Sequence, residues 1–161
     1  MNTCIYALLL ITTASFTFAN FKNESIDRMP SKFDHFDSTM VIHLYHGGGM
    51  HYSSKNIYIR FDSCIRVDML QGKDRVTKFA MTPEMRSNVF SILVKNNVEY
   101  IKQKEKSSFA NDKATKSICI EINGKKDLYF SSGSSTEIAE KSAADFNKIW
   151  EELEKFSLKN P

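Results

Sequence analysis

Three histidines, His43, His46 and His51, lie close together in the sequence and are the residues best suited to chemistry. Imidazole nitrogens ligate metals well, but only when the rings converge on one ion. On a regular strand His43 and His46 point to opposite faces, whereas His46 and His51 flank a glycine run that can fold back. Asp34 or Asp37 would add a carboxylate. The cluster predicts, as an alternative to the main interpretation below, a divalent-metal site in a small metal-dependent enzyme, and we expect no other cofactor.

The glycine run follows directly, because His46 to Gly49 reads HGGG, a string found in the oxyanion hole of lipases and esterases. Those enzymes also need a Gly-x-Ser-x-Gly elbow, which this sequence lacks. We therefore interpret the run as a hairpin loop whose backbone amides can wrap an anion or a partner's chain. Tyrosines nearby would add contact surface. The predicted binding loop comprises Tyr45, His46, Gly47, Gly48, Gly49, Met50 and Tyr52.

Two cysteines, Cys64 and Cys119, remain once an N-terminal segment that contains Cys4 is removed. Strand alternation predicts that both point away from the isoleucine face of a sheet. In an oxidising compartment such a pair favours a Cys64–Cys119 disulfide. Closing a loop of about 55 residues would stabilise the fold by roughly 4 kcal/mol. The alternative is two separate, reduced and partly buried thiols.

The N-terminus has the pattern of a secretory signal peptide over residues 1–19. Residues 1–20 contain no charged side chain, and the apolar stretch Cys4–Ile11 is too short to span a bilayer. Small residues at Thr17 and Ala19 suit cleavage after Ala19. The alternatives are a buried N-terminal strand or a helical anchor. We predict a secreted or periplasmic protein, with a polar, loosely ordered leader over residues 20–38 and one domain over residues 39–161.

Composition narrows the classes of partner. The 161 residues include 22 basic and 19 acidic side chains, a net charge of only +3, so we expect no nucleic-acid partner. The lysines of residues 102–116 are interpreted as a solvated loop. A hydrophobic content of 42% is typical of a globular chain. No second long apolar run follows residue 20, so we expect no membrane span in the mature chain.

Alternating apolar residues predict strands on both sides of a central helix. The alternation of Ile57–Phe61 continues in Ile65–Met69, which places Cys64 and Arg66 on the polar face if the parity holds. Asn123 and Gly124 form a strong hairpin signal after the isoleucines of residues 118–122. Val98–Ile101 is expected to add a short strand.

Two amphipathic helices complete the expected fold. Thr82, Pro83 and Glu84 form a helix start, followed by apolar residues at helical spacing up to about Asn96. Ser142 resembles the first residue of a capping box before the second helix. The apolar face of that helix comprises Phe146, Ile149, Trp150, Leu153 and Phe156.

These elements predict an α+β domain, in which two amphipathic helices cover the apolar face of a single, mostly antiparallel sheet. The expected order is roughly β-β-β-(β)-α-β-β-β-α. The favoured function is a non-catalytic binding or interaction domain of an inhibitor-like kind, with another extracytoplasmic protein as its partner. Besides the metal-dependent enzyme, the alternative is a carrier of a small apolar ligand held beneath the last helix.

Overall fold

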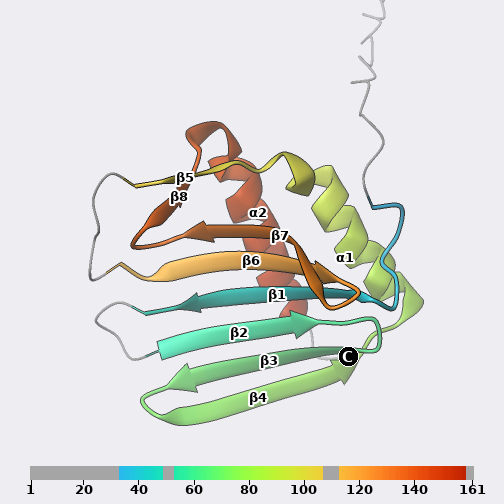
Figure 1. Cartoon of the computed structure of the whole chain (residues 1–161). Coiled ribbons are helices and arrows are strands. Elements are labelled where there is room, and N and C mark those ends of the chain that lie inside the picture. Colours follow the sequence, from blue (N-terminus) through green and yellow to red (C-terminus); the bar gives the residue numbers. More distant parts are fainter. Residues whose placement is uncertain (1–32, 49–52, 107–112, 159–161) are drawn as a thin grey trace, which may run out of the picture.

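Alternating apolar residues form the middle of a six-stranded antiparallel sheet with the order β4-β3-β2-β1-β6-β7 (Figure 1). The computed structural model describes residues 33–48, 53–106 and 113–158. The strands of this sheet are β1 (Met40–Gly47), β2 (Ser53–Ile59), β3 (Ser63–Leu70), β4 (Lys73–Ala80), β6 (Thr115–Ile122) and β7 (Lys125–Ser132). A second, two-stranded sheet pairs β5 (Gln103–Glu105) with β8 (Thr136–Ile138). Positive φ angles at Asn123 (54°) and Gly124 (70°) confirm the predicted hairpin turn.

The first helix, α1 (Pro83–Lys95), begins where the sequence predicts. The Thr82 hydroxyl accepts a hydrogen bond from the Met85 amide at 3.3 Å, which satisfies one of the free N–H groups of the first turn. Val89, Ile92 and Leu93 form the buried face, and the helix ends at Asn96. Both ends of the predicted helix are therefore confirmed.

The second helix, α2 (Glu140–Ser157), starts earlier than the predicted capping box. Ser142 lies inside the helix, where its hydroxyl accepts a hydrogen bond from the Lys102 amide at 3.1 Å, so its predicted role as the cap is wrong. The predicted strand at Val98–Ile101 is instead the 3-10 helix η1 (Val98–Tyr100). Strand β5 lies in the segment that the sequence indicates to be a solvated loop.

The core fills the space between one face of the sheet and both helices, which lie behind the sheet in Figure 1. Six isoleucine and leucine side chains of the central strands are fully buried: Ile42, Leu44, Ile57, Ile59, Ile118 and Ile120. Leu93, Ile149 and Leu153 cover them from the helices. Phe33 and Phe36 also belong to this core. The last part of the predicted loose leader is therefore packed against the domain.

The connection between β2 and β3 reverses the expected facing of β3. Ile59 pairs with Cys64 across the hairpin, so an odd-numbered residue of β2 shares a face with an even-numbered residue of β3. Cys64 and Arg66 consequently face the helices and are buried. Ile65, Val67 and Met69, which the alternation predicts to lie in the core, lie on the opposite face.

The predicted fold class is confirmed at the level of an α+β chain with a mostly antiparallel sheet and two helices. The order of elements differs from the expectation, because β8 forms a strand that the sequence did not indicate. Neither helix in the described part of the chain combines the length and apolar composition that crossing a bilayer requires. Residues 1–32 lie outside the described residues, so the signal peptide and most of the leader stay predictions.

Candidate binding surface

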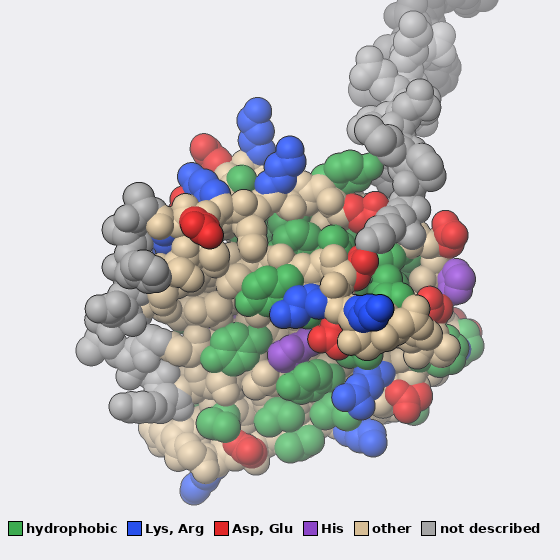
Figure 2. All heavy atoms as spheres, viewed as in Figure 1, with side chains coloured by type: hydrophobic (Ala, Val, Ile, Leu, Met, Phe, Trp, Pro, Cys, Tyr) green, Lys and Arg blue, Asp and Glu red, His purple; other side chains and the backbone are tan. Residues whose placement is uncertain are grey.

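The sheet face turned away from the helices, called the open face below, carries an uncovered band of aromatic and aliphatic side chains. Figure 2 shows these side chains gathered across the middle of the sheet, around one histidine. Strand pairing defines the open face by Val41, His43, Tyr45, Asn56, Tyr58, Ile65, Val67, Met69, Val76, Cys119 and Tyr129. Met69, Val76 and Tyr129 have exposed fractions of 42%, 61% and 44%. Large apolar side chains with this much exposure on one contiguous face indicate a contact surface.

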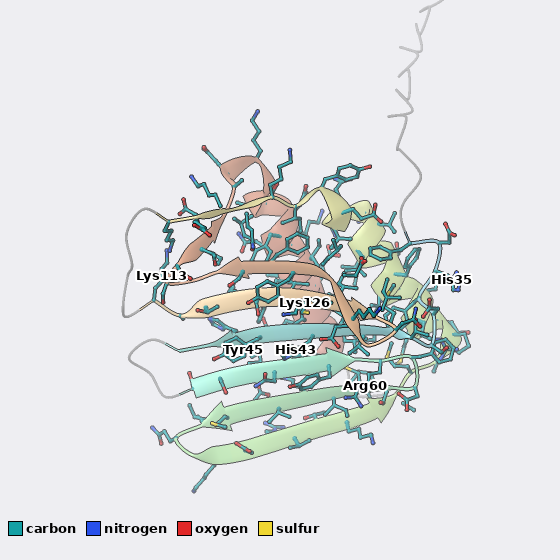
Figure 3. The ribbon with its side chains drawn as sticks, in the orientation of Figure 1. His35, His43, Tyr45, Arg60, Lys113 and Lys126 are labelled. Carbon is teal, nitrogen blue, oxygen red and sulfur yellow. The ribbon has the colours of Figure 1, made fainter. Side chains whose placement is uncertain are left out.

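The centre of the open face is held in place by neighbouring side chains. The His43 ring stacks on Tyr58, its cross-strand partner, with centroids 4.3 Å apart and planes 6° from parallel. His43 Nε2 lies within hydrogen-bond distance, 3.1 Å, of Asn56 Oδ1. Figure 3 shows His43 and Tyr45 on β1, on the side of the sheet that faces away from the helices. The rings are therefore positioned before any partner arrives.

Gly47 makes room for Tyr45 on this face. A Cβ atom at Gly47 would lie 2.7 Å from Tyr45 Oη and 2.8 Å from Ser54 Cβ, closer than such atoms approach. At Gly48 the backbone conformation, not the available space, favours glycine, because its φ is +84°. The first two glycines of the HGGG string thus have structural roles at the end of β1.

The charges on the open face are of both signs and cancel, and some of them lie beside the aromatic band. Asp74 and Lys78 lie on the edge strand β4, Glu121 lies near the end of β6, and Lys126 lies on the edge strand β7. Lys126 Nζ lies 4.8 Å from the centroid of the Tyr129 ring. An aromatic surface that carries a few charges of both signs resembles the anatomy of protein–protein interfaces.

On the helix side, a different group of polar residues surrounds Trp150 at one end of the sheet. The edge of His46 meets the Trp150 ring with centroids 5.6 Å apart. Lys55 Nζ and Lys116 Nζ lie 5.6 and 5.0 Å from the centroid of the Trp150 ring. Burial, followed by the nearby Lys116 and Lys55 ammonium groups, lowers the pKa of His46 below its ordinary value.

A buried arginine extends this polar group along β3. Arg66 Nε lies 2.6 Å from Asp68 Oδ2, and Arg66 Nη1 donates to Ser157 Oγ at 3.0 Å. Arg66 Nη2 lies 3.8 Å from Glu154 Oε1, which also pairs with Lys55. The guanidinium therefore joins β3 to the last turn of α2, and its burial follows from the reversed facing of β3.

The two cysteines are free, and the predicted disulfide is not found in the structure. Cys64 lies on β3 facing the helices, whereas Cys119 lies on β6 facing away from them. Three strand spacings of about 4.8 Å put these strands about 14 Å apart, beyond the reach of a disulfide. Burial raises the pKa of Cys64 to about 12, and burial and then Glu121 raise the pKa of Cys119.

The predicted binding loop is divided between two surfaces. Tyr45 lies on the open face, and its neighbour His46 faces the helices, so they cannot contact one partner side by side. The rest of that loop (Gly49, Met50 and Tyr52) and the third histidine, His51, lie outside the described residues.

The predicted metal cluster is separated in the same way, because His43 and His46 lie on opposite faces of β1. Within residues 33–48, 53–106 and 113–158, no group of three potential ligands comes together. Convergence of His46 with His51, on which the alternative of a metal-dependent enzyme depends, stays a prediction.

Comparison with known families and curated proteins identifies no relative of this chain. No protein-family model and no curated protein matches the chain. The sequence pattern did not identify the β3 and β4 residues of the open face or Tyr129. The length of the β2–β3 connection could have indicated this facing. Ile59 pairs with Cys64, and an even number of residues separates them, so the odd-numbered Ile65, Val67 and Met69 lie on the open face.

Proposed function

We propose that this chain is an exported, non-catalytic binding domain, and that another extracytoplasmic protein docks on its open face. The observation that carries the proposal is the aromatic band formed by His43, Tyr45, Tyr58 and Tyr129 across the strands from β2 to β7. A rigid sheet presents these rings at little cost in conformational entropy, because His43 and Tyr58 are already stacked.

The dimensions of the open face suit a protein partner. Five spacings of about 4.8 Å make the sheet about 24 Å wide, and strands of eight residues are about 26 Å long. One side of a standard interface covers about 800 Å², equivalent to a square with sides of about 28 Å. The open face is therefore close to the size that a stable complex buries.

The charge pattern favours protein over nucleic acid. Nucleic-acid surfaces need several cations placed to meet phosphates, and affinity follows the number of such contacts. On the open face, Lys78 and Lys126 are offset by Asp74 and Glu121. A partner with apolar side chains and charges of both signs fits this arrangement better than a polyanion does.

Site-specific photo-crosslinking tests the proposal in the exported chain. A crosslinker at Tyr129 or Val76 probes the open face, and one at Glu151, an exposed position of α2, probes the opposite side. We expect one identified protein to crosslink from the first two positions and not from Glu151. Tyr129→Ala should weaken that complex about 10-fold, as removal of a buried aromatic anchor does, and Glu151→Ala should leave it unchanged.

Two results would overturn the proposal. Equal crosslinking from both sides of the chain would show that the open face is not selective. Crosslinking only to a second copy of the chain would assign the face to self-association.

A further inference from the structure

Two cavities meet at His46, on the side of the sheet that faces the helices. The first, called the His46 cavity below, has a volume of about 360 Å³ and lies between strands β1, β6, β7 and β8 and the first half of α2. The second, of about 400 Å³, lies beside β2 and the end of β3. His46 and Ala114 line both cavities. Met69 of the open face lines the second cavity, whereas none of the residues that define the open face lines the His46 cavity. The His46 cavity therefore shares no lining residue with the proposed docking surface.

The walls of the His46 cavity differ in chemistry. Ile138, Ala143 and Phe146 make one side apolar. His46, Lys113, Lys116, Ser132 and Asn147 supply polar groups. Glu137 also lines the cavity, but its carboxylate lies 2.9 Å from Lys104 Nζ, which offsets its charge. The remaining charge at the cavity is therefore positive.

Lys116 is a cation of this cavity that has no counter-ion among the described residues. Its ammonium lies over the Trp150 ring, and no carboxylate among the described residues is within ion-pair distance of it. Lys55, which also lies near this ring, pairs with Glu154. A half-buried ammonium is stabilised further by an anion, because the surroundings screen charge less than water does.

Trp150 and His46, which lie next to Lys116, have hydrogen-bonding groups that remain available. Trp150 is 1% exposed, and its indole N–H has no hydrogen-bond partner among the described residues. His46 lies beside it, and the lowered pKa keeps the imidazole neutral and able to donate to an acceptor. The charged groups facing His46 are Lys116 and Lys55, with Glu154 opposing them, and Lys113, Glu137 and Asp68 line the adjoining cavities.

We propose that the His46 cavity binds a small monocarboxylate that carries a short apolar chain. The carboxylate faces Lys116 and His46, and the chain lies against Ile138, Ala143 and Phe146. A volume of about 360 Å³ is at the small end of ligand sites, which suits a single short chain. This chemistry is shared by free short-chain fatty acids and by the C-terminus of a peptide that ends in an apolar residue.

Trp150 provides the measurement, because it is the single tryptophan of the chain. Titration of the mature chain with octanoate should change its fluorescence and saturate, and calorimetry on the same solutions gives an independent affinity. Octanol and octylammonium should bind at least 10-fold more weakly, since they lack the carboxylate that pairs with Lys116. Short peptides with a free or an amidated C-terminal leucine separate the two sources of the carboxylate.

Variants test the two walls separately. Lys116→Gln should weaken octanoate binding about 10-fold, whereas Lys125→Gln, at the β6–β7 hairpin, should leave it unchanged. Ala143→Phe fills the apolar side of the cavity and leaves Lys116 in place. This variant should abolish saturable binding of octanoate. Absence of saturation with octanoate and with both peptides would overturn the proposal. Equal affinity for octanol, or for the Lys116→Gln variant, would overturn it as well.

Discussion

At the scale of single residues, Gly47 shapes the open face by what it lacks. Its missing side chain leaves the space that the Tyr45 hydroxyl occupies beside β2. The neighbouring histidines show a second effect of single positions, since His43 and His46 are three residues apart and serve different surfaces. His43 belongs to the stacked centre of the open face, and His46 to the wall of the cavity.

Gly47→Ala should lower the free energy of unfolding by about 1–3 kcal/mol, because Tyr45 and Ser54 must move to admit the new Cβ atom. Urea unfolding monitored by Trp150 fluorescence measures this change. The matched control is the same substitution in a Tyr45→Ala background, where the nearest atom is gone and the cost should be smaller. An equal cost in both backgrounds would show that Tyr45 is not the obstacle.

At the scale of elements, the connection between β2 and β3 determines which surface each side chain of β3 joins. The pairing of Ile59 with Cys64 turns Ile65, Val67 and Met69 outward and turns Arg66 toward α2. The same connection thus creates part of the open face and a buried ionic contact. Arg66 is retained in the core because Asp68, Glu154 and Ser157 provide partners for its guanidinium.

Arg66→Ala should lower the free energy of unfolding by about 3 kcal/mol, because it removes the shared partner of β3 and α2 and leaves acceptors unpaired. Chemical unfolding at neutral pH measures the loss. Arg60→Ala, at an exposed position of the β2–β3 connection, should stay within about 0.5 kcal/mol of the unsubstituted chain. If Arg66→Ala also stayed within that margin, the contact would not contribute to stability.

At the scale of the whole molecule, the fold separates two surfaces and keeps both cysteines apart. The open face and the His46 cavity lie on opposite sides of one sheet, so a protein partner and a small carboxylate would not compete for the same residues. The order of strands prevents the predicted Cys64–Cys119 disulfide, because β2 and β1 lie between the strands that carry the two cysteines. Stability therefore comes from packing, without help from a crosslink between these two residues.

The thiols of the exported product test this arrangement together with the predicted processing. We expect an intact mass that corresponds to residues 20–161 and no alkylation of the folded chain at neutral pH. Burial, with the pKa of Cys64 at about 12 and that of Cys119 also raised, keeps both thiols protonated and unreactive. In denaturant both should be alkylated without any reductant. A requirement for reductant would demonstrate a disulfide, and retention of residues 1–19 would contradict the predicted cleavage.

Elements whose signals are local can be predicted from the residues alone. Thr82 and Pro83 start α1 through contacts within one turn, and Asn123 with Gly124 turns the β6–β7 hairpin because both adopt positive φ. The spacing of Ile149, Trp150 and Leu153 likewise predicts the buried face of α2, and all three side chains are buried there. These features depend on residues a few positions apart, so the pattern of residue types suffices to predict them.

Which faces and strands come together depends on contacts between distant parts of the chain. Whether Cys64 points toward Ile59 or away from it depends on the hairpin pairing, and a shift of one residue there exchanges the two faces of β3. The position of β6 beside β1 depends on contacts between residues far apart in the sequence, for which one sequence carries no local signal. For that reason the core isoleucines were predictable, whereas the open face, the buried Arg66 and the cavity at His46 were not.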